Sequence, residues 1–252
     1  MRKSKFTLHY TVMLLQIICL LSPAFAIAGQ FNLLHTINEG ISGKSCDVTL
    51  KYCVEQKCKI PFRKVRSGIQ SAYAFFGKLG YTEKFPVTIV FKPEVNVDWS
   101  SGDDKKSIRV LGKYDEEEKT IYLTCWRDKW ISGRNDFDLD MTYEFYRTIV
   151  AHEMIHFLAN RFSKSRVNSI LSEYIAYSGQ IELLPEETVR LLVEKYKVQP
   201  FEESEIGEYL FVMDPGVFGL KSYLHYKNSK GLLVKQILDG SVMEPPNSWP
   251  PY

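Results

Sequence analysis

The sequence predicts an α+β fold in which a small sheet-containing N-terminal part precedes a mainly helical half. Strand-like runs rich in β-branched residues occur between residues 86 and 126. Helix-compatible segments then follow from residue 141 almost to the end of the chain. The first of these lies at the seam between the two parts and carries two histidines one turn apart. With 252 residues, of which 45% are hydrophobic, the chain is long enough for one sizeable packed domain or two small ones.

The N-terminus has the pattern of an export signal. Three basic residues within the first five precede an apolar run over residues 11–21, and two A-x-A arrangements of small residues follow within residues 24–28. The apolar run is short for a bilayer span of about 20 residues. We therefore expect residues 1–26 to be a cleaved signal peptide. The mature chain would be periplasmic or secreted and would not be membrane-bound.

The charge balance argues against a nucleic-acid partner. The chain has 32 basic and 30 acidic residues, and residues 1–26 contain three basic and no acidic ones. After cleavage 29 basic residues face 30 acidic ones, so the net charge is −1. Proteins that bind nucleic acid present basic surfaces instead.

Four cysteines remain after cleavage of the signal, namely Cys46, Cys53, Cys58 and Cys125. An even number in an exported chain suggests disulfides, for which three pairings are possible. One scheme joins the near neighbours Cys53 and Cys58 and leaves Cys46 to reach Cys125. The alternative, a second metal site, is disfavoured because the spacings match no common zinc knuckle. Residues 27–60 show little periodicity, so we expect an irregular, disulfide-tied segment ahead of the main domain.

The expected sheet lies in the first half of the chain. A helix over 62–79 comes first, because its apolar residues recur on one stripe. Strands are expected over 86–91, 107–111 and 120–126, with a solvated polar loop over 95–106. The third strand has two interpretations. It is either a sheet edge that could pair with an extended peptide or an ordinary core hairpin.

The second half is expected to be helical. Asp140 is a reasonable N-cap for a long helix over 141–161. Asp214-Pro215-Gly216 reads as a turn, and the Pro-rich tail over 246–252 is expected to be irregular. Further helices are expected over 169–183, 186–196, 203–211, 217–226 and 231–238.

The long helix contains the motif H-E-x-x-H, formed by His152, Glu153 and His156. Residues at i and i+4 lie one turn apart on the same helix face, so the two imidazoles can share one zinc ion. Glu153 can then reach a water on the metal without being a ligand itself. The alternative is coincidence. It is improbable because the chain has only five histidines.

A catalytic zinc ion is expected to have a third protein ligand. No H-E-x-x-H-x-x-G-x-x-H pattern is present, so this ligand comes from farther along the chain. Glu173 is the first choice, because it lies on the next helix among apolar neighbours, where an unpaired carboxylate is costly. Alternatively Glu173 is a surface residue, and the ligand is Glu182, Glu186 or Glu187.

The motif followed by Glu173-x-x-Ala176 resembles the gluzincin zinc metallopeptidases, in which a glutamate on the next helix is the third ligand. Residues 217–240 are similar to the C-terminal helices of peptidase-MA-like families, and the resemblance covers about residues 119–240. It implies a zincin-like domain over 61–245. The chain departs from the thermolysin-type pattern at Tyr177, where that pattern has an aspartate that orients a zinc histidine.

The resemblance implies hydrolysis of peptide bonds in a peptide or protein substrate, with one Zn²⁺ ion. Glu153 would act as the general base and pass the proton to the leaving amine. A further donor to the oxyanion is expected, and four residues are candidates: Tyr177, Tyr209, Tyr223 and His225.

Two alternative functions stay open. The chain could be a secreted binding or inhibitory module on the same fold, or a zinc amide hydrolase that acts on cell-wall material. Glu153 favours an enzyme, because a binding module needs no base beside its metal ligands.

Overall fold

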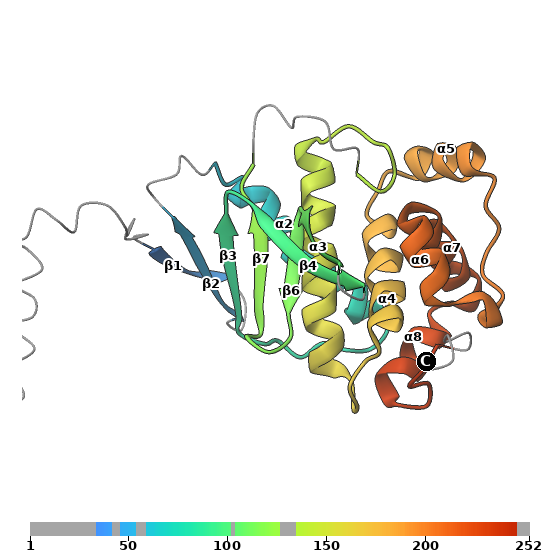
Figure 1. The fold of residues 1–252 in the computed structure, drawn as a ribbon. Coiled ribbons are helices and arrows are strands. Elements are labelled where there is room, and N and C mark those ends of the chain that lie inside the picture. The colour runs from blue at the N-terminus through green and yellow to red at the C-terminus, as the bar shows by residue number, and fades with distance from the viewer. Residues whose placement is uncertain (1–33, 42–45, 54–58, 102–103, 127–134, 246–252) are drawn as a thin grey trace, which may run out of the picture. The chain divides into compact units, whose positions relative to one another are not determined.

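A five-stranded mixed sheet, a separate two-stranded ribbon and seven α-helices are the main elements of the part of the chain that the computed structural model describes (Figure 1). This part covers residues 34–41, 46–53, 59–101, 104–126 and 135–245, which lie in one compact unit beginning at Leu34. Side chains are not described for residues 34–53 and 98–106. The expected signal peptide over 1–26, the tail over 246–252 and Cys58 lie outside the described residues.

The sheet has the strand order β1-β2-β3-β7-β6. Strands β2, β3 and β7 run parallel, while β1 and β6 pair antiparallel with their neighbours. β6 therefore forms one edge of the sheet, next to β7. The strands span Leu34–Ile41 (β1), Cys46–Cys53 (β2), Val87–Lys92 (β3), Gly112–Asp115 (β6) and Thr120–Thr124 (β7).

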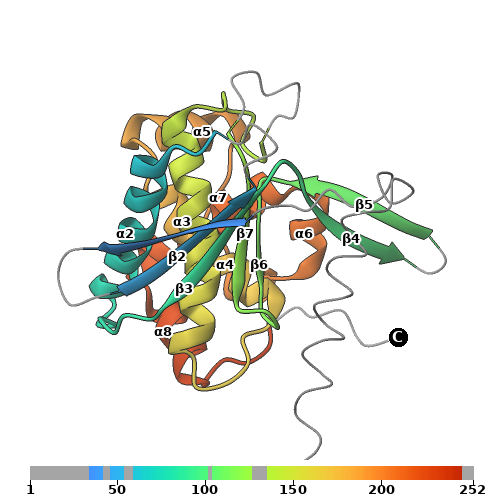
Figure 2. The same cartoon turned by 90° about the vertical axis from the view of Figure 1, so that its left-hand side faces the viewer.

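Two expectations about the sheet are wrong. The segment 27–60 is not irregular throughout, because β1 and β2 belong to the sheet and so to the main domain. The segment 95–106 is not a loop, because β4 (Val95–Ser101) and β5 (Asp104–Val110) pair as a separate antiparallel ribbon (Figure 2). Of the two interpretations of the third expected strand, β7, the structure supports the core hairpin, because β7 is interior and pairs antiparallel with β6. Each error concerns a pairing between segments, which local patterns do not specify.

Two helices pack side by side against the sheet: α2 (Phe62–Lys78) and α3 (Tyr143–Phe162) (Figure 2). α2 connects the parallel strands β2 and β3, which need such a crossover. Fully buried side chains from α2, the sheet and α3 form the core between them, among them Phe76, Ile89, Ile121, Leu123, Val150 and Leu158.

A glycine sets the distance between α2 and α3. A Cβ atom added at Gly68 would lie 2.7 Å from the carbonyl oxygen of Arg147 and 2.8 Å from the Cβ of Val150. A Cβ at Gly77, on the same helix, would meet nothing within 4 Å. The two glycines therefore have opposite roles, although both lower helix propensity.

We expect Gly68→Ala to destabilise the protein by about 1–3 kcal/mol, because α2 and α3 must move apart. Gly77→Ala is the matched control and should stabilise the protein by about 0.5–1 kcal/mol, since alanine has the higher helix propensity. Urea unfolding of both variants measures the difference. Equal effects of the two substitutions would contradict the close contact at Gly68.

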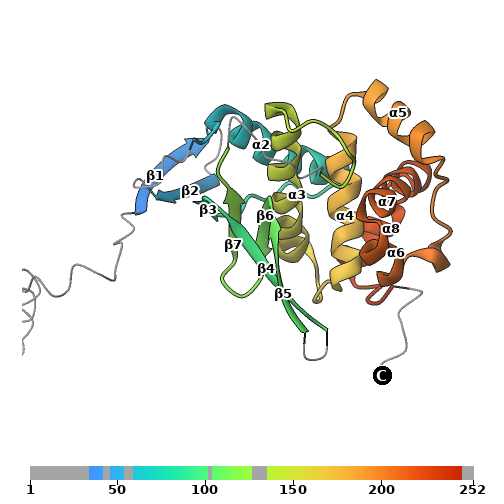
Figure 3. The same ribbon diagram turned by 45° about the horizontal axis from the view of Figure 1, so that its top comes forward.

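The helical half follows the expected order (Figure 3). α4 packs against α3 and α7, and α7 also contacts α6 and α8. The expected helix over 203–211 is divided into a 3-10 helix and α6, and Asp214 caps α7 rather than forming a turn. The helices span Ser169–Glu182 (α4), Glu186–Tyr196 (α5), Glu203–Glu205 (η2), Glu208–Met213 (α6), Pro215–Ser229 (α7) and Leu232–Asp239 (α8). Among the described helices, none has the length and apolar character needed to cross a membrane.

Cys125 forms a disulfide and follows β7 directly. In the register of the sheet, Tyr52 of β2 lies beside Phe91 of β3, which lies beside Leu123 of β7. Cys53, the last residue of β2, is therefore level with the end of β7. Cys46 begins β2, seven residues earlier, which is about 23 Å along a strand. Disulfides join Cα atoms less than about 7 Å apart, so the scheme that pairs Cys46 with Cys125 does not fit the register.

β3 lies between β2 and β7, so Cys53 is two strand spacings, about 10 Å, from the end of β7. Lys59 pairs with Trp126, and we therefore expect Cys58, the residue before Lys59, to be the partner of Cys125. Trypsin cuts after Lys51 and Lys57, so Cys46, Cys53 and Cys58 fall on three different peptides. Mass spectrometry of an unreduced digest should find the Cys125 peptide linked to the Cys58 peptide. A linkage to the Cys46 peptide would contradict the register.

Candidate metal centre

Helix α3 presents His152 and His156 on one face. The helix begins after Thr142, whose side chain accepts a hydrogen bond from the Phe145 backbone N–H at 3.0 Å; the N-cap is thus Thr142 rather than the expected Asp140. No proline or glycine interrupts the following 20 residues. The spacing of four residues then brings the two Nε2 atoms to 3.0 Å from each other.

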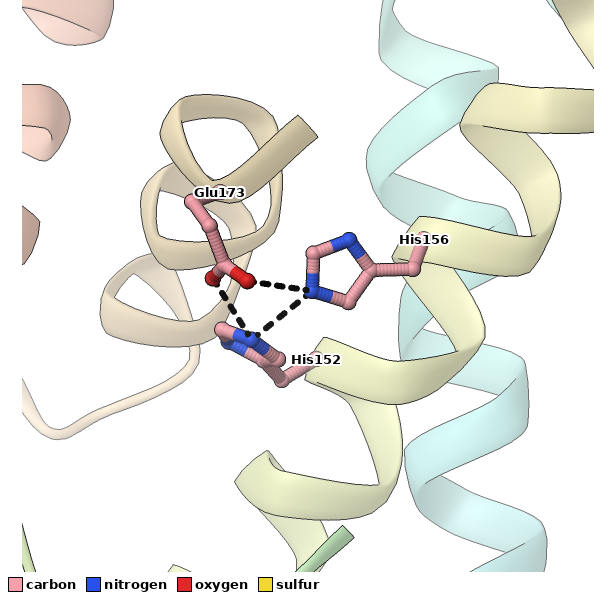
Figure 4. Close-up of side chains that lie close together, drawn as sticks. All are labelled: His152, His156 and Glu173. Carbon is pink, nitrogen blue, oxygen red and sulfur yellow. Dashed lines mark hydrogen bonds and ion pairs between the residues drawn. The ribbon is translucent and has the colours of Figure 1, made fainter. Parts of the chain in front are cut away.

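Helix α4 presents Glu173 to the same point (Figure 4). One carboxylate oxygen lies 3.4 Å from Nε2 of His152, and the other lies 3.6 Å from Nε2 of His156. The three residues each offer a ligand atom within 4.8 Å of the others. Within the described part of the chain, no other group of three His, Cys, Asp or Glu residues is arranged in this way.

The geometry fits a small divalent ion. Two ligand atoms at 2.0–2.2 Å from one ion in a tetrahedral arrangement lie about 3.3–3.6 Å apart. The observed separations of 3.0, 3.4 and 3.6 Å are close to this range. Two imidazole nitrogens and one carboxylate form a donor set that zinc commonly takes in catalytic sites. The three residues can therefore hold a metal ion with little movement of their side chains.

Both histidines have hydrogen-bond partners on α4 through their other ring nitrogen. Nδ1 of His152 lies 2.8 Å from Oε1 of Gln180, and Nδ1 of His156 lies 2.7 Å from Oγ of Ser172. Such partners hold metal-binding imidazoles in orientation. Tyr177, which stands where the thermolysin-type pattern has an aspartate, is not one of these partners. α4 thus provides the carboxylate and both orienting groups.

Glu153 is buried beside the triad, with 7% of its surface exposed. Burial raises the pKa of its carboxyl to about 7, and the negative charge of Glu173 acts in the same direction. Charge interaction with His152 and a hydrogen bond from the Tyr114 backbone lower the pKa in part. A carboxyl with a pKa near 7 can accept and return a proton at neutral pH.

The edge strand β6 lies directly against Glu153. A Cβ atom added at Gly112 would lie 2.6 Å from a carboxylate oxygen of Glu153 and 2.5 Å from its Cγ. Only a residue without a side chain therefore fits at this point of the strand. Together with the hydrogen bond from the Tyr114 backbone, this contact makes β6 one wall beside the carboxyl.

The pKa of the Glu173 carboxyl shifts in the opposite direction. Burial would raise the pKa of its carboxyl, but the neighbouring His156 and His152 together hold it well below its usual range. The carboxylate of Glu173 is thus charged, as a metal ligand must be, while the carboxyl of Glu153 titrates near neutrality.

We expect the raised pKa of Glu153 to make the stability of the metal-free protein depend on pH. The pKa of Glu153 is about 7 in the folded protein and 4.5 ordinarily, so the folded state holds a proton that the unfolded chain releases between these values. Stability should therefore fall by about 3 kcal/mol as the pH rises from 4.5 to 7. Glu153→Gln should lack this fall, because glutamine does not titrate. Urea unfolding at a series of pH values compares the two proteins, and parallel curves would contradict the raised pKa.

Of the four expected oxyanion donors, Tyr177 packs against the triad. Its ring contacts the His152 ring edge-on, with centroids 4.8 Å apart. Its hydroxyl donates to the carboxylate of Asp136 at 2.6 Å, and burial, followed by the charge of Asp136, raises its pKa well above the usual value. The hydroxyl of Tyr177 is thus protonated at neutral pH but is engaged by Asp136.

The other three candidates have different surroundings. Tyr209 is 62% exposed on α6. Tyr223 is on α7, where burial, followed by the charges of Glu182 and Glu186, raises the pKa of its hydroxyl. Nδ1 of His225 lies 2.8 Å from the hydroxyl of Tyr174, in the contact between α4 and α7.

The three alternative third ligands lie outside the triad. Glu182 forms an ion pair with Lys78 at 2.9 Å, and Glu187 forms one with Arg190 at 2.6 Å. Glu186 lies in the first turn of α5. None of the three belongs to the group formed by His152, His156 and Glu173.

Sequence reasoning missed Ser172, Gln180 and Gly112. A signal for Gln180 exists, because it follows Glu173 by seven residues, or two helical turns, and so lies on the same face of α4. Gly112 gives no local signal. Its role depends on the distance between β6 and α3.

The family comparison covers the site. A model described as a family of unknown function (DUF6639) matches residues 56–245, which include every residue of the candidate metal centre. Strands β1 and β2 precede the matched region. No curated protein and no solved structure matches the chain.

Proposed function

This chain belongs to the DUF6639 family, a family of unknown function, and we propose that it is an exported zinc metallopeptidase of the gluzincin type. One observation carries the proposal. Two histidines and a carboxylate converge within 4.8 Å, and a buried carboxyl follows the first histidine directly. A purely structural metal site would not need a proton acceptor at that point.

His152, His156 and Glu173 would hold the ion. A bound zinc ion supplies Lewis acidity, which activates water as a nucleophile and polarises a carbonyl group. Glu173 brings one negative charge to the site, and the two imidazoles are neutral ligands, so one positive charge remains uncompensated. Three protein ligands would leave one position of a tetrahedral ion for water or substrate, as in catalytic zinc sites.

Glu153 would move the proton. Its carboxylate takes a proton from the attacking water and then delivers it to the nitrogen of the leaving amine. In the metal-free protein the pKa of this carboxyl is about 7. The positive charge of a bound ion would lower that pKa and so favour the carboxylate form, which accepts the proton. The hydrogen bond from the Tyr114 backbone and the contact with Gly112 hold the carboxyl in one position.

The edge strand β6 supports a polypeptide substrate over a small amide. β6 pairs with β7 on one side only within the described sheet, and it lies beside the proton acceptor. An extended peptide can add to such an edge through backbone hydrogen bonds. This would bring a peptide bond of the substrate close to the metal ligands.

The disulfide at Cys125 supports export, because disulfides persist in oxidising compartments such as the periplasm and the extracellular space. The signal pattern over residues 1–26 points in the same direction.

The test combines metal analysis with hydrolysis of an unfolded protein substrate. We expect about one zinc ion per chain, cleavage of unfolded casein, loss of cleavage with 1,10-phenanthroline and recovery with added zinc. A protein without zinc would contradict the metal site. A zinc-loaded protein inactive on polypeptides but active on peptidoglycan amides would favour the cell-wall hydrolase. A zinc-loaded protein inactive on both substrates would favour the binding module.

A further inference from the structure

We propose that Thr148 and Gln180 form a hydrogen-bonded chain that fixes the tautomer of His152, so that Nε2 is the ring nitrogen left to bind a cation. This inference rests on the proposed metal site. It assigns a positioning role to two residues that lie outside the ligand set. The direction of each hydrogen bond follows from the one before it, beginning at a backbone carbonyl of α3.

The first step is the hydroxyl of Thr148. Its Oγ1 lies 2.8 Å from the carbonyl oxygen of Phe145 and donates to it. A hydroxyl group has one proton, so Oγ1 can only accept from any further partner. The side chain of Thr148 is 1% exposed, which excludes water as a ready substitute for these contacts.

The second step is the orientation of the Gln180 amide. Nε2 of Gln180 donates to Oγ1 of Thr148 at 3.4 Å. The amide turned over would set its carbonyl oxygen against Oγ1, which has no proton left to donate. The carbonyl oxygen of Gln180 therefore faces His152, at 2.8 Å from Nδ1. Gln180 is buried, so an unmade hydrogen bond at its amide would be costly.

The hydrogen-bonded chain ends at His152, where it decides which ring nitrogen carries the proton. A carbonyl oxygen only accepts, so Nδ1 must carry the proton. A neutral imidazole has a single N–H, and Nε2 therefore presents its lone pair. Nε2 lies 3.4 Å from Glu173 and 3.0 Å from Nε2 of His156, so it is the ring nitrogen that faces the position of the cation. In the other tautomer a proton would occupy the position of the cation.

The hydrogen-bonded chain needs Thr148 because its central residue is a glutamine. An aspartate beside Nδ1 would fix the tautomer alone, because an ionised carboxylate only accepts hydrogen bonds. A glutamine offers an acceptor and a donor, so a third group has to decide which of them faces the histidine. Thr148 lies four residues before His152, on the same face of α3, and can reach both the Phe145 carbonyl and Gln180.

Thr148→Val tests the proposal, because valine keeps the shape of threonine and removes only the hydroxyl. Ser222→Ala is the matched control, since Ser222 is also fully buried and donates to a backbone carbonyl, that of Phe218, at 2.8 Å. Thr148→Ser retains the hydroxyl and should behave as the wild type. The double variant Thr148→Val/Gln180→Glu replaces the amide with an acceptor-only carboxylate and should not need the hydroxyl.

The first readout is the tautomer of His152 in the metal-free protein, from ¹⁵N ring shifts at a pH where the imidazole is neutral. We expect Nδ1–H in the wild type, in Ser222→Ala, in Thr148→Ser and in the double variant, and a mixture of tautomers in Thr148→Val. The second readout is zinc affinity by competition with a chelator. Thr148→Val should bind zinc about 10–100-fold more weakly, as is typical when an outer partner of a ligand is lost.

The inference is overturned if the wild type carries the proton on Nε2 of His152. It is also overturned if Thr148→Val leaves both the tautomer and the zinc affinity unchanged, or if the double variant fails to restore them. Failure of the proposed function is distinguishable. If the wild type carries Nδ1–H on His152 but binds no zinc, the hydrogen-bonded chain is supported and the metal site is contradicted.

Discussion

Glu153→Gln is expected to abolish hydrolysis of unfolded casein while the protein still binds zinc. General acid–base catalysis contributes about 10²–10⁴-fold to rates, so activity should fall by at least this factor. The amide of glutamine has nearly the same shape as the carboxyl and fits beside Gly112, but it cannot take a proton from water. Because Glu153 is not in the ligand triad, the zinc content should stay at that of the wild type.

The control for this variant is Glu144→Gln, which makes the same chemical change in the first turn of α3. Glu144 is exposed and pairs with Lys64 and Arg147. Its substitution should leave activity unchanged and reduce stability by at most about 1 kcal/mol. Glu153→Gln with full zinc and wild-type activity would remove Glu153 from the mechanism. Loss of zinc in that variant would instead assign it a role in metal binding.

The second large effect is expected from Glu173→Ala, which removes the only carboxylate of the triad. Two imidazoles from one helix would then hold the ion without the charge that partly neutralises it. Zinc affinity should fall by more than the roughly 10–100-fold that loss of an outer partner costs. Competition with a chelator measures the affinity, and hydrolytic activity at limiting zinc should fall with it.

Glu187→Ala is the control for this variant, because Glu187 was an alternative third ligand and lies on α5 in an ion pair with Arg190. It should bind zinc as the wild type does. If Glu173→Ala retains wild-type affinity while Glu187→Ala loses it, the triad is wrong and the third ligand comes from α5.

Sequence reasoning performed best where the information is local. The helices α2, α3, α4, α5 and α8 lie within two residues of their expected bounds, because their apolar periodicity and their Pro and Gly boundaries act over a few residues. The spacing of His152 and His156 is of the same kind, since a helix alone brings side chains at i and i+4 together.

The choice of Glu173 needed a further inference. A carboxylate among apolar residues needs a partner, and the histidines of the preceding helix were expected to supply it through the metal. The structure brings Glu173 against both histidines. The strands were harder to predict, because β1 and β2 acquire their place only through pairing with β3. The ribbon of β4 and β5 was missed since its polar residues resemble those of a loop.

The sequence by itself determined that two imidazoles and a glutamate share one helix, because helical geometry fixes their relative positions. Only the tertiary structure decided what surrounds them: Gly112 of the edge strand against Glu153, and Gln180 with Thr148 behind His152. These contacts join residues 28 to 41 positions apart in the chain. Their existence depends on how closely β6, α3 and α4 pack, which is a property of the whole core rather than of any local pattern.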